Sequence, residues 1–218
     1  MNHVDIEENA DGRDFIIGDL HGEWSKLCSE MALVDFNPAV DRLFSVGDLI
    51  DRGPESEKCL SLIDEPWFHA VIGNHEQMAY DSVVNPLFKD GEMLGNWYMN
   101  GGNWHAECDV DLVRPLIGKI KELPLTITIG GRIGICHANP PHDWASRANF
   151  AEANLLWGRT KIRNKEAWTV DNIERVYVGH TPVDAPVTLG NCHYIDTGAC
   201  FGGRLTMREI PPPNTSSI

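Results

Sequence analysis

The sequence is poor in positive charge, with 18 Lys and Arg residues against 32 Asp and Glu residues among 218. The resulting formal net charge is −14, and a chain this acidic repels polyphosphate backbones and anionic lipid headgroups. Broad binding to nucleic acid or to a membrane surface is therefore disfavoured. A small phosphate substrate stays compatible with the charge, because a bound metal ion can reverse the sign of the field within one site.

Long hydrophobic runs and paired cysteines are also missing. No stretch approaches the roughly 18 apolar residues of a membrane-spanning helix. The first eight residues are acidic and lack the apolar core of a signal peptide. The six cysteines include no Cys-x-x-Cys pair, so we expect reduced thiols in a cytoplasmic protein.

Three catalytic motifs are absent or incomplete. No Gly-x-x-x-x-Gly-Lys-Ser/Thr loop occurs, which excludes a P-loop nucleotidase. Cys108 and Arg114 have the spacing of cysteine phosphatases, but the acidic loop 109–113 between them lacks glycine and would repel phosphate. His75 begins a His-Glu-x-x-His pattern in which Ala79 replaces the second histidine, so no zinc-protease helix is present.

Short apolar strands alternate with helical patterns, which is typical of a layered α/β fold. The predicted strands are 15–17, 43–46, 70–72, 125–129, 132–136, 176–178, 193–195 and 205–207, with helices at 23–33, from 54, from 76, 92–99 and 112–122. Gly130-Gly131 predicts a two-residue hairpin turn. No linker divides the chain, so we expect a single domain over 1–210 and a disordered tail over 211–218.

A recurring pattern places a ligand-capable side chain after an apolar strand, usually following a glycine. The five residues at these strand ends are Asp19, Asp48, Asn74, His137 and His180. Active sites of open α/β folds gather at the carboxyl ends of strands, and glycine lets the backbone approach a ligand closely. The pattern therefore predicts one polar site built from distant parts of the chain.

The donor types at these strand ends indicate metal binding. His21 lies two residues after Asp19, close enough for both to reach one ion. Carboxylate, carboxamide and imidazole donors without thiolate suit Mn, Fe or Zn better than Mg. Six donors exceed what one ion with an open position needs, so we expect two ions with Asp48 as the bridge.

The motifs around these donors resemble a known family. They read Gly18-Asp19-Leu20-His21-Gly22, Gly47-Asp48-Leu49-Ile50-Asp51-Arg52-Gly53 and Gly73-Asn74-His75-Glu76. Together they resemble the signatures of the phosphoprotein phosphatases, within the metallophosphoesterase superfamily. The likeness extends to the lambda-type phage and bacterial serine/threonine protein phosphatases through residues 66–68, 100–102, 122–125, 135–138, 150–159 and 195–199. It covers the chain from about Phe15 to Met207.

The resemblance implies a fold and a role for each matching residue. The fold would be the calcineurin-like phosphoesterase domain, a central β-sandwich of mixed sheets flanked by helices in four layers, α/β/β/α. One metal ion would be held by Asp19, His21 and Asp48, and the other by Asp48, Asn74, His137 and His180. Arg52 and Arg159 match the arginines that bind phosphate, His75 matches the general acid, and Asp51 matches the carboxylate that orients it. Gly158 and the loop 139–144 differ from the family pattern.

We therefore predict a metal-dependent phosphomonoesterase that acts on phosphoserine and phosphothreonine in proteins, with phosphotyrosine as a further candidate. The mechanism would be direct attack of a hydroxide made near neutral pH by two divalent ions, Mn²⁺ first, with Fe, Zn, Ni and Co as alternatives. The expected partner is a phosphoprotein or phosphopeptide, with no nucleic acid, no membrane and a monomeric chain. One alternative is a diadenosine polyphosphate hydrolase, and another is a non-catalytic phosphopeptide-binding module that keeps the metals.

Other conspicuous side chains are assigned ordinary structural roles. His105, His142 and His193 are expected to be surface or packing residues rather than ligands. Trp97, Tyr98 and Trp104 have a spacing that is more often found in a hydrophobic core than on a peptide-binding surface.

Overall fold

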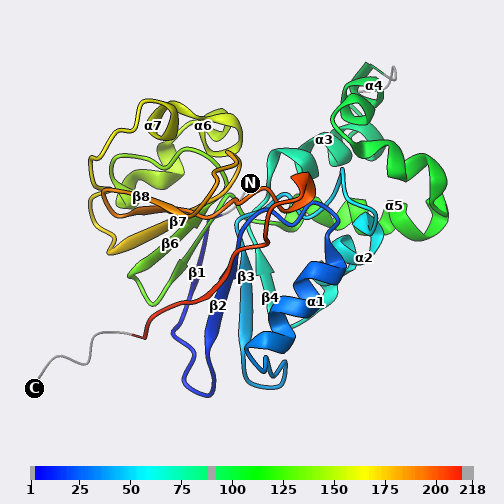
Figure 1. Cartoon of the computed structure of the whole chain (residues 1–218). Coiled ribbons are helices and arrows are strands. Elements are labelled where there is room, and N and C mark those ends of the chain that lie inside the picture. Colours follow the sequence, from blue (N-terminus) through cyan, green and yellow to red (C-terminus); the bar gives the residue numbers. More distant parts are fainter. Residues whose placement is uncertain (1–2, 88–91, 213–218) are drawn as a thin grey trace, which may run out of the picture.

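The computed structural model describes residues 3–87 and 92–212 as two β-sheets packed face to face, with helices outside them (Figure 1). The strands are β1 (His3–Ile6), β2 (Asp14–Ile17), β3 (Arg42–Ser45), β4 (Phe68–Ala70), β5 (Thr126–Ile129), β6 (Ile133–Cys136), β7 (Arg175–Val178), β8 (Val187–Leu189), β9 (Cys192–Tyr194) and β10 (Met207–Glu209). The α-helices are α1 (Trp24–Leu33), α2 (Ser56–Ser61), α3 (Asn74–Val83), α4 (Glu92–Met99), α5 (Val110–Lys119), α6 (Glu152–Trp157) and α7 (Thr160–Arg163). Helices α1 to α5 lie on one side of the molecule, and α6 and α7 lie on the other (Figure 1).

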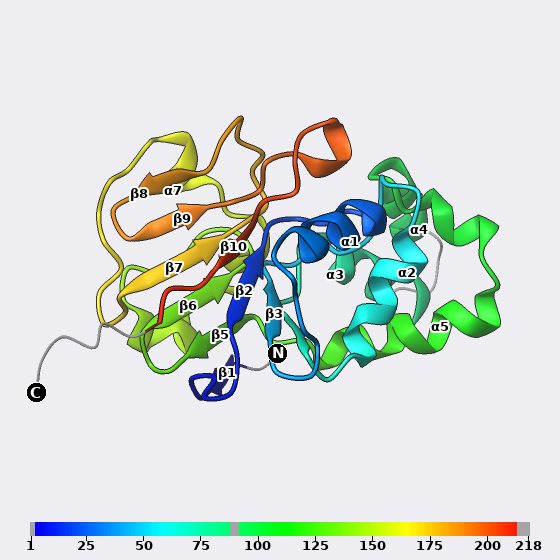
Figure 2. The same ribbon diagram turned by 60° about the horizontal axis from the view of Figure 1, so that its bottom comes forward.

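Both sheets are mixed. The larger has the strand order β1-β5-β6-β7-β9-β8 and the smaller β10-β2-β3-β4. Pairs β5–β6, β8–β9 and β10–β2 are antiparallel, and the others are parallel. Figure 2 shows β10, the last strand of the described residues, lying against β2, the second strand. The expected sandwich of two mixed sheets flanked by helices is confirmed.

The central strands are apolar on both faces because each face is covered. On β2, Ile16 packs in the layer between the two sheets, whereas Phe15 and Ile17 pack in the larger cluster that includes the helices. On β6, Ile133 and Ile135 belong to the inter-sheet layer. Successive side chains of these strands point into two different apolar layers, and neither face of the strand is polar. This explains why their sequences are continuous hydrophobic runs.

The sequence-based strand prediction is right for the core and wrong at the edges. Strands β1 and β8 were not predicted, because they are short edge strands with exposed or polar positions. Strand β4 ends at Ala70, so residues 71–73 form the loop that leads into α3 rather than a strand. The Gly130-Gly131 turn is confirmed between β5 and β6, and both glycines have positive φ, at 55° and 67°.

The C-terminal prediction is tested only in part. Pro211 and Pro212 have no regular secondary structure, and residues 213–218 of the predicted tail lie outside the described part of the chain. Strand β10 covers Met207–Glu209, two residues later than predicted. Within the described ranges, no helix is long and apolar enough to cross a membrane.

The inter-sheet layer should dominate the stability of the fold. Ile135 is fully buried there, so Ile135→Ala should lower the free energy of unfolding by about 2–5 kcal/mol through lost burial and a cavity. Val187→Ala on edge strand β8, where the side chain is 36% exposed, is the matched control and should change it by about 0.5 kcal/mol or less. Urea unfolding followed by circular dichroism measures both, and equal losses would contradict the assignment.

Candidate active site

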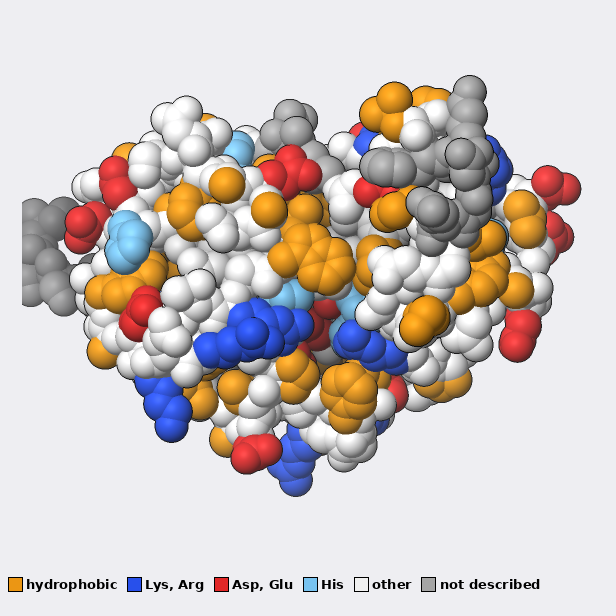
Figure 3. Space-filling view, turned by 90° about the horizontal axis from the view of Figure 1, so that it is seen from above, with side chains coloured by type: hydrophobic (Ala, Val, Ile, Leu, Met, Phe, Trp, Pro, Cys, Tyr) orange, Lys and Arg blue, Asp and Glu red, His pale blue; other side chains and the backbone are white. Residues whose placement is uncertain are grey.

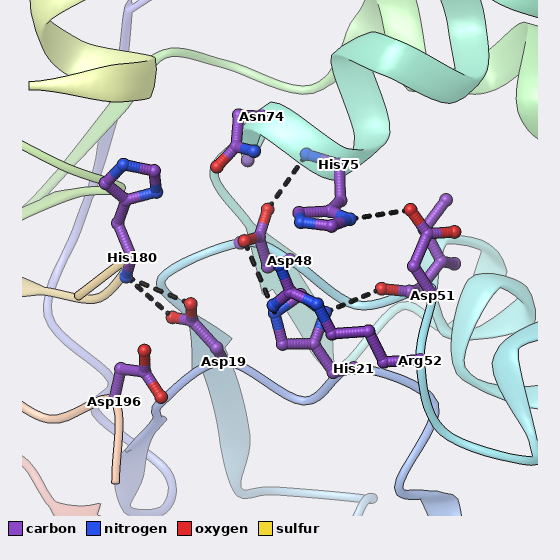
Figure 4. A network of polar contacts seen from close by, with 12 residues as sticks. Asp19, His21, Asp48, Asp51, Arg52, Asn74, His75, His180 and Asp196 are labelled. Carbon is purple, nitrogen blue, oxygen red and sulfur yellow. Dashed lines mark hydrogen bonds and ion pairs between the residues drawn. The ribbon is translucent and has the colours of Figure 1, made fainter. Parts of the chain in front are cut away.

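The loops after five strands converge at one end of the sandwich. Asp19 follows β2, Asp48 follows β3, Asn74 follows β4, His137 follows β6 and His180 follows β7. All five side chains are buried, with at most 5% of each residue exposed. Figure 4 shows the Asp48 carboxylate at the centre of the network.

The surface over this end of the molecule is hollowed. Figure 3 shows histidine and acidic side chains at the bottom of a central depression, with Lys and Arg side chains on two sides of it and a hydrophobic group at its edge. The depression gives a charged ligand access to the buried network. The Lys and Arg side chains beside it make the charge at this end locally positive, although the chain as a whole is acidic.

One group of ligand atoms surrounds His137. Its Nδ1 donates to the carbonyl oxygen of Val46 at 2.8 Å, which leaves a lone pair on Nε2. That Nε2 lies 2.9 Å from Asn74 Oδ1, 3.2 Å from His180 Nδ1 and 3.4 Å from Asp48 Oδ2. Lone pairs of nitrogen and oxygen thus converge on one point, which is the arrangement that a metal ion completes.

A second group shares Asp48. His21 Nδ1 donates to the carbonyl oxygen of Ile50 at 2.8 Å, so Nε2 carries its lone pair and lies 3.6 Å from Asp48 Oδ2. The guanidinium of Arg52 contacts this Nε2, so a cationic group already occupies the direction of the lone pair. Ligand atoms of His21, Asp48 and His75, and separately of Asp48, His137 and His180, lie within 4.8 Å of one another.

The buried carboxylates of the site have an excess of negative charge that the neighbouring imidazoles do not neutralise. Burial raises the pKa of Asp19 well above its ordinary value, and the neighbouring carboxylates of Asp196 and Asp48 raise it further. Burial lowers the pKa of His21 and of His180 to about 3, so both imidazoles are neutral at physiological pH. Neutral imidazoles beside crowded carboxylates are suitable ligands for divalent metal ions, so these side chains fit the predicted pair.

Glycines before the ligands allow the loops to pack this closely. A Cβ atom on Gly73 would lie 2.2 Å from Asp48 Oδ1, and one on Gly179 would lie 2.0 Å from Asp19 Oδ1. Both distances are far below van der Waals contact. The strand–glycine–ligand pattern of the sequence therefore reflects the space that the neighbouring carboxylates need.

Glu76 is a functional residue whose role the sequence reasoning missed. Its buried carboxylate accepts backbone N–H groups from Asp48 at 2.7 Å, Leu49 at 2.8 Å and Gly73 at 3.0 Å. Burial, with the charge of Asp48, raises its pKa to about 7. The residue ties the loop after β3 to the loop after β4. The signal available was its place at the end of the Gly-Asn-His-Glu motif.

His75 and Asp51 form a buried pair beside the ligand groups. His75 Nδ1 lies 2.6 Å from Asp51 Oδ2, and neither residue is more than 2% exposed. The same carboxylate accepts the indole N–H of Trp97 at 2.8 Å and of Trp104 at 2.7 Å. The core role expected for Trp97 is therefore correct but incomplete, because its polar edge holds Asp51.

The two predicted phosphate-binding arginines come from different loops. Arg52 follows Asp51 directly, and its guanidinium lies 5.3 Å from the ring centre of Phe201. Arg159 is half-buried, and its Nη1 donates to Thr181 Oγ1 at 3.2 Å, next to His180. Both guanidinium groups can therefore approach a ligand bound near Asp48.

The three histidines assigned to packing lie elsewhere. His105 packs 5.3 Å from the ring of Trp97, and His142 lies 3.9 Å from that of Trp168. His193 lies 5.5 Å from the ring of Tyr177. Among the described residues, none of the three belongs to a group of potential metal ligands.

Comparison with known proteins agrees with the geometry. Residues 15–199 match the family described as Metallophos, calcineurin-like phosphoesterase. Serine/threonine-protein phosphatase 1 of Salmonella typhimurium is 36% identical over 205 residues, which cover 90% of this chain and 91% of the relative. Serine/threonine-protein phosphatase 2 of Escherichia coli is 35% identical over 206 residues, covering 90% and 92%.

More distant relatives carry a different name. Bis(5'-nucleosyl)-tetraphosphatase PrpE of Geobacillus thermodenitrificans is 29% identical over 229 residues, which cover 93% of this chain and 92% of the relative. Among solved structures, a putative diadenosine tetraphosphatase superposes with a TM-score of 0.73 at 21% identity, covering 96% of this chain and 94% of that one. The superposition supports the fold alone. On the family match and the identities above, this chain belongs to the calcineurin-like phosphoesterase family.

Proposed function

We propose that the protein is a metal-dependent phosphatase that removes phosphate from phosphoserine and phosphothreonine in proteins. The observation that carries the proposal is the pair of ligand groups that share Asp48, one of which contains His75. The names of the relatives at 36% and 35% identity favour a phosphoprotein substrate.

The proposed metal ligands combine members of the two groups with Asp19 and Asn74, and they leave out His75, which is assigned the role of acid. Asp19, His21 and Asp48 would hold one ion, and Asp48, Asn74, His137 and His180 would hold the other. The mixed oxygen and nitrogen donors favour Mn²⁺, with Fe, Zn, Ni and Co as the alternatives to be compared. When bound, two such ions polarise phosphoryl oxygens and make hydroxide available near neutral pH.

The remaining side chains supply the other requirements of phosphate ester hydrolysis. Arg52 and Arg159 can donate to the non-bridging oxygens of the phosphoryl group with planar guanidinium groups that match its geometry. A serine alkoxide is a poor leaving group and needs a proton. His75 can give this proton from Nε2, since its Nδ1 is held by Asp51.

A dinucleotide polyphosphate hydrolase is the second candidate. It is favoured by the 29% identity to the bis(5'-nucleosyl)-tetraphosphatase. Release of nucleotides from diadenosine tetraphosphate, with no release of phosphate from phosphopeptides, would support it. A non-catalytic binding module is disfavoured, because Asp51, Arg52 and His75 are all present.

The direct test is phosphate release from a phosphopeptide panel. The protein is first stripped with a chelator and then supplied separately with Mn²⁺, Fe²⁺, Zn²⁺, Ni²⁺, Co²⁺ or Mg²⁺. We expect loss of activity on chelation and the strongest recovery with Mn²⁺. Full activity in the stripped protein would refute metal dependence.

Loss of the proposed proton donor should depend on the leaving group. His75→Asn should lower turnover of a phosphoserine peptide by about 10²–10⁴-fold, the usual contribution of general acid catalysis. Turnover of p-nitrophenyl phosphate should fall much less, because its leaving group needs no proton. His193→Asn on β9, outside the ligand groups, is the control. Equal losses on both substrates would remove the acid assignment from His75.

Loss of the shared carboxylate should weaken both metal positions. Asp48→Asn removes the negative charge common to the two groups and replaces one of its two ligand oxygens with an NH2 group, so dialysed protein should retain fewer than two equivalents of Mn²⁺. Asp35→Asn, a change in the loop after α1, is the control and should retain the wild-type amount. Elemental analysis after gel filtration measures both, and two full equivalents in Asp48→Asn would contradict the bridge.

A further inference from the structure

We propose that Trp97 and Trp104 are positioning residues that fix the proton donor His75 through Asp51. This inference rests on the proposed function, because it assigns His75 the role of acid. Asp51 Oδ2 accepts His75 Nδ1–H at 2.6 Å and Trp97 Nε1–H at 2.8 Å, and Oδ1 accepts Trp104 Nε1–H at 2.7 Å. Three donors thus surround one carboxylate.

Burial makes these indole contacts consequential. Asp51 and Trp97 are fully buried, and the rings of Trp97 and Trp104 meet edge to face with their centres 6.0 Å apart. A buried carboxylate needs hydrogen-bond donors to replace the water it has lost. Because the two indoles take both oxygens, they fix the plane of the carboxylate. That plane sets the direction in which the His75 ring points.

A glycine pair brings the indoles to the catalytic loop. The carbonyl oxygen of Gly101 accepts the backbone N–H of Arg52 at 3.2 Å, and a Cβ there would lie 2.8 Å from that nitrogen. A Cβ on Gly102 would lie 2.4 Å from the Trp97 ring. Larger residues at either position would push the segment 97–104 away from Asp51. The pair therefore explains why α4 and the turn after it pack so closely on the site.

The test removes one N–H while keeping an aromatic ring. Trp104→Phe should lower kcat for a phosphoserine peptide by about 10-fold or more, the scale of one lost hydrogen bond to a charged group, with KM unchanged. Across aryl phosphates, the loss should grow as the pKa of the leaving phenol rises. Trp97→Phe should give the same trend. Trp67→Phe, which removes an exposed indole bond to Glu65 of 2.9 Å, is the control.

The leaving-group series separates the possible failures. A merely structural role would lower the melting temperature or reduce all aryl phosphates equally, and either result without the trend overturns the inference. The aryl series applies even if no phosphopeptide is hydrolysed. Failure of the peptide assay therefore counts against the proposed function, whereas a flat series counts against the positioning role.

A separate observation concerns an open hollow beside the site. It has a volume of about 390 Å³ and is lined by Trp157, Arg159, Thr160, Arg163 and Asn164. Trp157 is 48% exposed, and its ring centre lies 6.2 Å from that of His180, so the hollow lies next to one of the ligand groups. We infer that it is a subsite for a second anionic group of the substrate.

Charge supports an anion as the occupant. Within residues 3–87 and 92–212, neither Arg159 nor Arg163 makes an ion pair, although the chain carries a net charge of −14. Burial and the charge of Arg163 lower the pKa of the Arg159 guanidinium. Two neighbouring cations without an acidic partner attract an anion. On the proposed function, that anion is a carboxylate or a second phosphate beside the phosphoserine.

Matched peptides test this subsite. Arg163→Gln should raise KM several-fold for a phosphoserine peptide with flanking glutamates, and leave KM unchanged for its glutamine counterpart and for p-nitrophenyl phosphate. Arg114→Gln on α5 is the control. Equal effects on both peptides, or none on either, overturn the inference. A rise in KM confined to diadenosine tetraphosphate would assign the hollow to a nucleotide polyphosphate and would refute the peptide subsite.

Discussion

The site depends on one electrostatic constraint: electron pairs and carboxylates are crowded into a largely buried space at the bottom of a depression. The Nδ1 atoms of His21 and His137 donate to backbone carbonyls, so their Nε2 lone pairs must face Asp48. Asp19 and Asp196 add further negative charge nearby. Only positive charge resolves this crowding, and the family to which the chain belongs supplies it with metal ions. The loops around the site are built to hold the ligands in place for them.

Holding these loops requires unusual backbone conformations. Among the described residues, eight non-glycine residues have positive φ, and five belong to the site: His21, Asp48, Asp51, Arg52 and His180. Such conformations are costly for residues with a Cβ and persist only where the surroundings enforce them. Glu76 provides much of that enforcement, because its carboxylate binds the backbone N–H groups of the loop that contains Asp48. Local strain and ligand geometry are therefore maintained by the same residue.

The sequence could predict the proposed metal ligands better than the residues that hold the catalytic side chains in place. A glycine and a polar residue after an apolar strand is a local pattern, so Asp19, Asp48 and His180 stand out without any structure. The support from Trp97 and Trp104 was not predictable in this way, because a buried tryptophan has the same spacing whether or not its N–H meets a carboxylate. Edge strands β1 and β8 were missed for a similar reason, since their pairing is set by distant neighbours rather than by their own residues. The boundaries of the domain and the roles of the ten site residues stay predictions.

The antiparallel pairing of β10 with β2 has a consequence for how the protein is made. The backbone N–H of Gly18, just before Asp19, donates to the carbonyl oxygen of Thr206 at 3.0 Å. The first ligand loop in the sequence is thus completed by a segment that is synthesised long after it. A nascent chain carries Asp19 and His21 long before His180 and β10 can join them. The complete site must therefore form only after β10 has emerged, in one step rather than gradually as its ligand loops are synthesised.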